Sequence, residues 1–312
     1  GGTVICMGNH IAGGRVLEPS AGVGHFLGAM PEDVARRSQM HAVEIDRVSG
    51  RILQALYGHE ARVHIAGLEK CRFPDGWFDL VVGNVPFGKY TVPCSLHKPY
   101  SAESIHNYFL GRSLDLVRPG GLVAIITSTY FLDSEREAFR RYIAARARLL
   151  GAIRLPRGAF RQCAGTVVST DILFFQRREL NAVVPQGENG WAQRGALPAS
   201  VLPPYVDRHL TLKSNWWGEH GELVVGQWKD VRGQYTRELA VEYDGDDVPE
   251  QVRARLRHLP SQVYTSRATL EADDTAIEVG DALQAQAWRT GELDVRQDAL
   301  VEIGRASCRE RV

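Results

Sequence analysis

A glycine-containing turn between a strand and a helix is the first stretch of the sequence that could bind a ligand. Residues 15–18 are predicted to form a strand, and a turn over residues 19–24 then opens a helix at His25. Glycines allow a tight turn and a close approach to a ligand, at the end of the strand where open α/β sheets bind ligands. Glu18, just before the turn, disfavours a pyrophosphate and favours a ligand that carries an ammonium group. Alone, such a turn can also be purely structural.

Three acidic residues further along could contact the rest of such a ligand. Glu44 lies near the end of a second predicted strand, residues 41–46. Its distance from Gly24 is close to the spacing at which an acid accepts hydrogen bonds from ribose hydroxyls in nucleotide-binding folds. Asp46 is the second candidate for that role. Glu69 follows a third predicted strand, where it could meet an adenine ring or be a surface carboxylate.

The strongest chemical signal is Asn84-Val85-Pro86-Phe87, directly after a fourth predicted strand at residues 78–83. Residues 79–88 resemble the catalytic motif of the amino-group DNA methyltransferases, which is usually written NPPF or NPPY. Residues 17–24 resemble the S-adenosylmethionine motif of that family, and residues 43–46 resemble its second motif. The resemblance covers roughly residues 12–178 and implies adenine rather than cytosine as the target base.

The resemblance implies a cofactor, S-adenosylmethionine, and no metal. The catalytic residues that it implies are Asn84, Val85, Pro86 and Phe87. The residues expected around the cofactor are Glu18, Pro19, Ala21, Gly22, Gly24, Phe26, Glu44, Asp46 and Glu69.

The chemistry of an adenine amine explains why this motif suits it. The amine is a poor nucleophile because its lone pair is delocalised into the ring. The Asn84 side-chain oxygen and the Val85 carbonyl can accept its two hydrogens and favour a tetrahedral nitrogen, in line with the methyl group. Phe87 would stack on a base swung out of the duplex. Val85 replaces the commoner proline, which loosens a backbone constraint, although only its carbonyl is needed. The alternative is a plain strand-to-loop turn with a buried phenylalanine.

The elements that must position these residues alternate regularly up to residue 178. Besides the four strands, strands are predicted at residues 122–127, 149–155 and 171–176, and helices around residues 51–56, 104–117, 135–147 and 248–259. Pro119-Gly120-Gly121 predicts a turn. Apolar strands that alternate with helices imply an α/β fold: a Rossmann-like methyltransferase with a mostly parallel, doubly wound sheet. Residues 181–205 are rich in proline and glycine and are predicted to be a linker or loop.

Composition excludes several classes of protein. The chain has 312 residues with 37 basic and 37 acidic side chains, which argues against a strongly basic nucleic-acid scaffold but permits a local basic groove. No apolar run approaches about 18 residues, so no membrane span is predicted. The cysteines other than Cys308 are far apart without a CxxC pair, which favours free thiols in the cytoplasm of a bacterial or phage-infected cell.

The wider pattern suggests a piece of a larger protein. Residues 88–121 resemble the methylase–helicase fusion proteins of phages and mobile elements, with DNA as the partner and a role in restriction-modification, defence or anti-restriction. We expect residues 1–178 to be a methyltransferase domain truncated at its N-terminus. Residues 179–301 would connect it to a helicase, and residues 302–312 resemble a translated sequencing adapter.

Further nucleic-acid contacts are predicted less sharply. Candidate phosphate contacts are Lys89, Arg118, Arg154, Arg157 and Arg161, and His106 and Tyr108 could line the nucleic-acid face or pack a helix. Residues 205–270 are the only room for target recognition, with Trp216, Trp217, Trp228, Arg253, Arg255 and Arg257. Two alternatives stay open, namely methylation of RNA or a protein glutamine, and a catalytically silent cofactor- or DNA-binding module.

Overall fold

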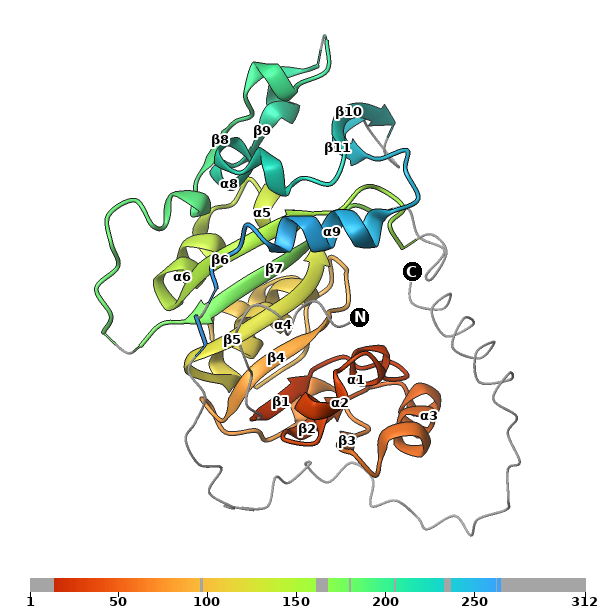
Figure 1. The fold of residues 1–312 in the computed structure, drawn as a ribbon. Coiled ribbons are helices and arrows are strands. Elements are labelled where there is room, and N and C mark those ends of the chain that lie inside the picture. The colour runs from red at the N-terminus through yellow and green to blue at the C-terminus, as the bar shows by residue number, and fades with distance from the viewer. Residues whose placement is uncertain are drawn as a thin grey trace.

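The computed structural model describes residues 14–95, 98–160, 168–179, 181–204, 206–232, 237–261 and 263–264. Its centre is a seven-stranded sheet with the order β3-β2-β1-β4-β5-β7-β6 (Figure 1). The strands of this sheet are β1 (Arg15–Glu18), β2 (Gln39–Val43), β3 (Ala61–His64), β4 (Phe78–Asn84), β5 (Val117–Ser128), β6 (Ala147–Arg154) and β7 (Thr170–Arg177).

The sheet is mostly parallel, as predicted. β1 pairs in parallel with both β2 and β4, and β4 pairs in parallel with β5. Only β7 runs the other way, because it forms antiparallel ladders with β5 and with β6. The predicted α/β fold with a mostly parallel sheet is therefore confirmed. The first five strands end at one edge, so the residues that follow β1, β2 and β4 must meet there.

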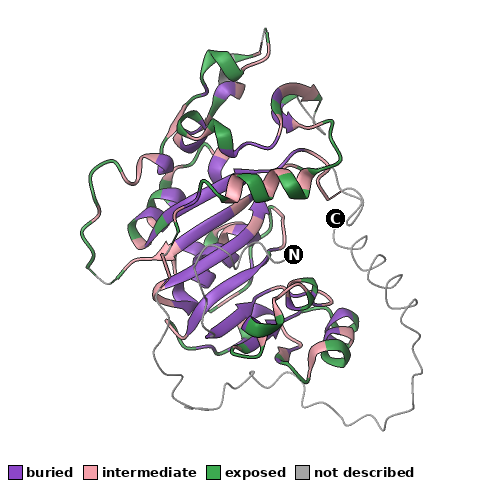
Figure 2. Cartoon of the chain, in the orientation of Figure 1, coloured by how far each residue is buried: buried purple, intermediate pink, exposed green. Residues whose placement is uncertain are grey.

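Helices cover both faces of the sheet. α4 (Ile105–Leu116) lies behind β4 and β5, whereas α9 (Val248–Leu256) crosses in front of β6 and β7 (Figure 1). The other helices are α1 (His25–Gly28), α2 (Glu32–Ala35), α3 (Arg47–Tyr57), α5 (Tyr130–Asp133), α6 (Ala138–Arg146) and α8 (Asn215–Glu219). Figure 2 shows the central strands buried along most of their length, with the exposed residues on the outer sides of the helices. The near-continuous apolar strands thus lie between two helical layers.

The predicted Pro-Gly-Gly turn is an irregularity inside β5 rather than a gap before it. β5 starts directly after α4, and its register with β4 shifts between the partners of Phe78 and Leu80. Gly120 has φ +73°, a conformation that favours glycine. The turn signal therefore correctly marks a local kink, but the strand continues through it.

Part of the predicted linker belongs to the core, which corrects that expectation. Trp191 is 3% exposed and packs against the rings of Phe131 and Phe175. β8 (Arg194–Ala196) pairs with β9 (Leu212–Ser214), and β10 (Gln227–Arg232) pairs with β11 (Arg237–Glu242). The Val225 N–H donates to the Arg154 carbonyl at 2.9 Å, beside the last strand of the sheet. Proline and glycine content marked irregular backbone here, but part of this segment packs into the core.

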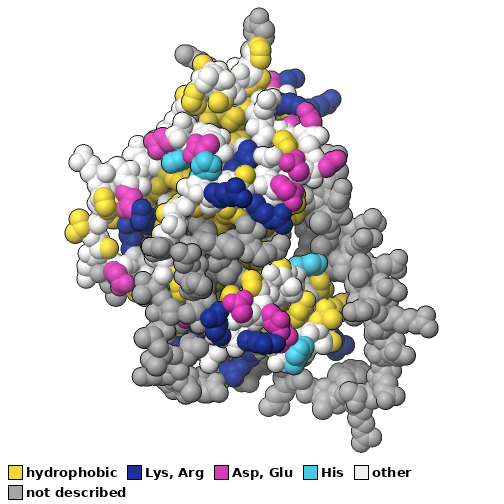
Figure 3. Space-filling model, viewed as in Figure 1, with side chains coloured by type: hydrophobic (Ala, Val, Ile, Leu, Met, Phe, Trp, Pro, Cys, Tyr) yellow, Lys and Arg dark blue, Asp and Glu magenta, His cyan; other side chains and the backbone are white. Residues whose placement is uncertain are grey.

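Charge and hydropathy add two observations. On the face shown in Figure 3, basic and acidic side chains of the described residues are interspersed rather than gathered by sign. Among the described residues, no helix has the length and apolar character needed to cross a membrane.

Candidate functional site

The turn after β1 has the backbone shape that its glycines predicted. Gly22 and Gly24 have φ +59° and +92°, and the Gly24 N–H donates to the Ala21 carbonyl at 2.9 Å. A Cβ on Gly24 would lie 2.6 Å from a ring carbon of Tyr57, so glycine is also required by packing. A Cβ on Gly22 would meet no atom of the described residues within 4 Å. The turn is therefore closed on the Gly24 side and open above Gly22.

The structure brings Glu44 to this turn. Glu44 is 1% exposed, and its Oε2 accepts a 2.7 Å hydrogen bond from the Gly22 N–H. Its Oε1 accepts a 2.8 Å bond from the Asp46 N–H. The Ala21 N–H donates to the Val43 carbonyl at 2.8 Å, which fixes the turn against the end of β2. The two motifs that sequence reasoning linked are thus in direct contact.

Asp46, the second candidate for the ribose, serves the local structure. It is the N-cap of α3, and its side chain accepts a 2.7 Å hydrogen bond from the Ser49 N–H. This cap satisfies a donor at the helix terminus. Glu69 lies in a 3-10 turn, Leu68–Lys70, that follows β3, the strand at one end of the sheet.

Glu18 is buried at the end of β1 with part of its carboxylate unsatisfied. It is 2% exposed, and its Oε2 has no hydrogen-bond partner among the described residues. Burial raises the pKa of this carboxyl well above its usual range, and the Glu44 carboxylate raises it further, against a hydrogen bond from the Leu27 backbone. A buried acid of this kind gains most from a cationic partner. Nearby, Pro19 is buried and Phe26 is half-buried against the core.

The Asn84 segment lies beside the turn. Asn84 ends β4 and is exposed, and its main-chain carbonyl accepts a 2.8 Å hydrogen bond from the Ser20 Oγ. Val85 is 2% exposed, and its N–H donates to the Ile126 carbonyl of β5 at 3.1 Å. A proline at position 85 has no N–H and could not make this bond. The hydrogen bond therefore constrains the backbone at Val85, where the loss of the commoner proline was expected to loosen it. Pro86 and Phe87 are half-buried, and Phe87 packs against the core.

Two residues of this site were missed by sequence reasoning. Ile45 is 66% exposed although it follows the buried Glu44, so it presents an apolar side chain at the binding edge. The sequence signal that could have revealed Ile45 is its position between Glu44 and Asp46 at the end of a strand. Ser20 joins the turn to Asn84, but a serine inside a turn is too common to reveal such a partner.

Two of the predicted phosphate contacts are engaged elsewhere. Arg154 is 1% exposed and forms a bidentate pair with Asp171, with both N···O distances 2.8 Å. Arg118 donates from its Nε to Asp79 at 2.5 Å. Both predictions are therefore wrong, because each guanidinium satisfies a buried carboxylate. Arg157 is half-buried, Arg161 lies outside the described residues, and Lys89 is exposed.

The other candidates for nucleic-acid contact are mostly structural. His106 and Tyr108 are 5% and 0% exposed on α4, so they pack the helix, and burial lowers the pKa of His106 to about 4. The three tryptophans considered for target recognition are all core residues: Trp216, Trp217 and Trp228. Among the arginines of α9 and its end, Arg255 donates to the Val224 carbonyl, Arg253 pairs with Glu250, and Arg257 is exposed.

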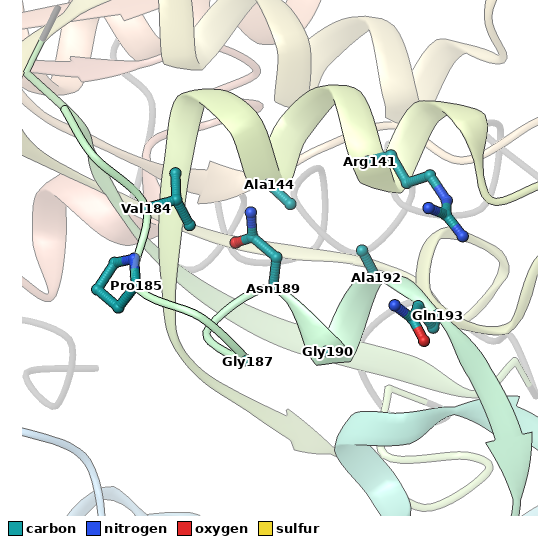
Figure 4. A pocket seen from close by; sticks show the side chains of 9 residues that line it. All are labelled: Arg141, Ala144, Val184, Pro185, Gly187, Asn189, Gly190, Ala192 and Gln193. Atoms are coloured by element: carbon teal, nitrogen blue, oxygen red, sulfur yellow. The ribbon is translucent and has the colours of Figure 1, made fainter. Parts of the chain in front are cut away.

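A hollow on another part of the surface does not contain the candidate residues. It has a volume of about 380 Å³ and lies between α6 and the chain from Val184 to Gln193 (Figure 4). Its polar lining comes from Arg141, Asn189 and Gln193. None of its lining residues belongs to the glycine turn or to the Asn84 segment. The site at the ends of β1 and β4 is defined by its side chains and the hydrogen bonds between them.

Comparison with known proteins shows which sequences this chain resembles. Residues 44–159 match the family model described as Eco57I restriction-modification methylase. Over 253 residues the chain is 32% identical to the "Defense against restriction protein B" of Escherichia phage P1, which covers 78% of this chain and 10% of that protein. The chain thus spans about a tenth of the length of this curated relative.

Two of the solved structures that are similar to this chain come from restriction systems. One is assigned as the modification subunit of a type I restriction enzyme from Vibrio vulnificus, with a TM-score of 0.49 and 18% identity over 78% of this chain and 57% of that chain. Another is the methyltransferase subunit of a type I restriction-modification system from Streptococcus thermophilus, with a TM-score of 0.45 and 16% identity over 54% and 40% of the two chains. The part of the chain that matches the Eco57I restriction-modification methylase model contains Glu44 and the Asn84 segment.

Proposed function

We propose that this chain transfers the methyl group of S-adenosylmethionine to the exocyclic amine of adenine in DNA. One observation carries the proposal: the exposed Asn84 at the end of β4 is joined by the 2.8 Å Ser20 hydrogen bond to the glycine turn after β1. A methyl acceptor held at Asn84 and a donor held at the turn would therefore meet at one edge of the sheet. Bringing two reactants together in a fixed geometry is a large part of catalysis.

The residues around the turn fit S-adenosylmethionine. The unsatisfied Oε2 of Glu18 suits the ammonium group of its amino-acid part, and that contact would favour the ionised carboxylate. Glu44 lies at the turn, bonded to the Gly22 and Asp46 N–H groups, and a carboxylate at this place is the type of group that accepts from ribose hydroxyls. Ile45 offers an apolar face for the adenine part. The open space above Gly22 lets the ligand approach the backbone.

When bound, S-adenosylmethionine supplies an electrophilic methyl group on a sulfonium. The protein must then present the amine nitrogen in the correct direction. The Asn84 side-chain oxygen and the Val85 carbonyl accept the two amine hydrogens, so the lone pair of the nitrogen is freed from the ring. The Val85–Ile126 hydrogen bond holds that carbonyl in place. Phe87, already half-buried, can support one face of the flipped base.

The wider role is part of the proposal. We infer DNA as the macromolecular partner because the matched family is one of restriction-modification methylases. The phage P1 relative is named for defence against restriction, which supports a role in restriction-modification or anti-restriction. The division into a methyltransferase domain up to residue 178, a connector and a helicase that follows remains a proposed organisation.

A methyl-transfer assay tests the function. We expect label from the cofactor to enter adenine-containing duplex DNA, and nuclease digestion followed by mass spectrometry to give N6-methyladenine. Asn84→Ala should lower turnover by about a hundredfold or more while circular dichroism stays unchanged. Asn189→Ala is a matched control, because Asn189 lies in the distant hollow of Figure 4. Label that appears only in RNA or protein, or only on cytosine, would overturn the proposal.

A further inference from the structure

Two exposed tyrosines and a lysine lie on the loops that follow β4 and β5. Tyr90 is 60% exposed and Tyr130 is 59% exposed, although aromatic side chains usually gain from burial. Lys89 precedes Tyr90 in the chain, and its Nζ lies 5.9 Å from the centroid of the Tyr130 ring. These three residues, here called the aromatic ledge, have no part in the roles assigned above to the glycine turn and Asn84.

The ledge is close to the candidate catalytic residue. β4 and β5 are parallel neighbours, and Asn84 is in register with Ile126. Tyr130 follows four residues after Ile126, directly beyond the end of β5, and Lys89 follows five residues after Asn84. The contact between Lys89 and Tyr130 shows that the two loops converge at the same edge of the sheet. A nucleic-acid strand that places one base at Asn84 must therefore pass near the aromatic ledge.

Tyr130 is held firmly in its exposed position. The next two residues of α5, Phe131 and Leu132, are 2% and 0% exposed. Asp133 at the end of the same helix accepts hydrogen bonds from Arg154 at 2.8 Å and 3.2 Å. The helix is thus anchored at three of its four residues, and only the tyrosine faces water. A ring fixed in place loses little conformational entropy when another ring stacks on it.

Lys89 has charge available for an anionic partner. Among the described residues Lys89 forms no ion pair, and its cation–π contact leaves the ammonium able to bind a phosphate. Single-stranded nucleic acid is bound elsewhere by this combination, in which aromatic rings stack on bases and basic side chains follow the backbone. Gly88 supports the arrangement, because a Cβ there would lie 2.5 Å from the Tyr90 ring.

We propose that the aromatic ledge binds the nucleotide next to the flipped target base, with Tyr130 stacked on that neighbouring base and Lys89 on its phosphate. The inference rests on the proposed function, because it assumes a nucleic acid at Asn84. It adds a binding site for the flanking strand. It also predicts that the chain binds substrates with an unstacked neighbour better than fully stacked duplexes.

Binding and turnover measured on the same variants of the 312-residue chain test the ledge. The probes are a fluorescein-labelled single strand and duplex of mixed sequence, followed by anisotropy, together with KM and kcat for methyl transfer. Tyr130→Leu keeps apolar bulk and removes the ring, whereas Tyr130→Phe keeps the ring. We expect Tyr130→Leu to weaken single-strand binding and raise KM by about tenfold, and Tyr130→Phe to stay near wild type.

The salt dependence of binding tests the role of Lys89. Lys89→Ala should reduce the salt dependence of binding, with the slope of log affinity against log salt falling by about 0.7 for a single strand. Arg141→Ala is the matched control, because Arg141 is an exposed cation on α6 in a different part of the fold. It should leave both affinity and slope unchanged.

The outcomes separate the ledge from the methyl-transfer proposal. Wild-type binding by Tyr130→Leu, or equal losses in Tyr130→Leu and Tyr130→Phe, overturns the ledge while methyl transfer to DNA still stands. Absence of any nucleic-acid binding by the wild-type chain overturns the ledge as well. If methyl transfer to DNA fails but Tyr130→Leu and Lys89→Ala still weaken binding as described, the ledge stands and the proposed function falls.

Discussion

The Ser20 hydroxyl donates a 2.8 Å hydrogen bond to the main-chain carbonyl of Asn84, so the turn after β1 is tied to the segment after β4. The two residues are 64 positions apart in the chain but lie at the ends of neighbouring parallel strands. On the same side, a Cβ at Gly83 would lie 3.2 Å from the Pro19 ring, so the two strand ends are also closely packed. The donor and acceptor halves of the proposed site therefore share one rigid connection.

Removing this connection should reduce turnover more than stability. Ser20→Ala loses one hydrogen bond, which costs about 1 kcal/mol of the free energy of unfolding. Because a small misplacement of reacting groups is costly, we expect kcat to fall by about tenfold. Ser38→Ala is the matched control, since the Ser38 hydroxyl donates to the Val34 carbonyl at 2.7 Å, outside the site. Urea unfolding and methyl-transfer kinetics measure both effects. Equal kinetic losses in the two variants would show that the Ser20 bond has no special role.

Glu18→Gln should stabilise the protein and weaken cofactor binding. Burial raises the pKa of Glu18, so the folded state holds its proton where the unfolded state, with an ordinary value of 4.5, releases it. The stability that Glu18 contributes is therefore complete below pH 4.5 and is lost as pH rises through the folded pKa. Glutamine carries no such proton, so the advantage of the variant in unfolding free energy should grow as pH rises above 4.5, which urea unfolding at a series of pH values measures.

Glu18→Gln should lower the affinity for the cofactor, although it raises the stability of the protein. A neutral amide cannot pair with an ammonium group, so calorimetry should show affinity for S-adenosylmethionine reduced by about ten- to a hundredfold. Glu32→Gln, at an exposed residue of α2, is the control and should change neither quantity. An unchanged affinity in Glu18→Gln would remove Glu18 from the cofactor site.

The buried histidines of β2 and β3 predict a loss of stability in acid. His41 Nδ1 and His64 Nε2 are 3.2 Å apart, and both residues are buried. Burial lowers their pKa values from 6.5 to about 3 for His41 and about 4 for His64. Below pH 6.5 the unfolded chain takes up protons that the folded chain refuses, so the unfolding free energy falls as pH drops towards 4.

The slope of this fall can be measured. Two such histidines contribute up to about 2.7 kcal/mol per pH unit. Urea unfolding between about pH 7 and about pH 5 should show a shallower fall in His64→Gln than in wild type, because one titrating group is gone. Comparing variant with wild type cancels the opposite trend from Glu18. The exposed His25→Gln is the control. Parallel profiles for wild type and His64→Gln would refute the explanation.

The sequence predicted the parts of the fold that depend on local patterns. The alternation of apolar strands and helices predicted the mostly parallel sheet, and the glycines predicted the turn that the positive φ angles of Gly22 and Gly24 require. Glu44 was linked to that turn by spacing alone, and their hydrogen bond confirms that the two motifs meet. These inferences succeeded because strand ends of one parallel sheet must converge.

What the sequence could not predict depends on partners far along the chain. Trp216 resembled a recognition residue until the structure showed its Nε1 donating to the Ala152 carbonyl of β6 at 3.1 Å. Trp191 lay in a segment whose composition indicated a linker, yet it packs on Phe131 and Phe175. The roles expected for Asn84 and Phe87 remain predictions, because they need a bound base.

Substitution of Arg154 should cause the largest loss of stability among these variants. Its guanidinium is held by Asp171 and Asp133 and lies 4.5 Å from the centroid of the Trp217 ring. Arg154→Met leaves the buried Asp171 carboxylate without its cation, whereas Asp133 keeps Lys213 at 3.1 Å, so we expect the free energy of unfolding to fall by about 3–5 kcal/mol. Arg141→Met removes only an exposed helix pair and should cost less than about 1 kcal/mol. Urea unfolding followed by tryptophan fluorescence measures both variants. A loss in Arg154→Met no larger than in Arg141→Met would show that the buried pair is dispensable, and it would reopen a role for Arg154 in phosphate contact.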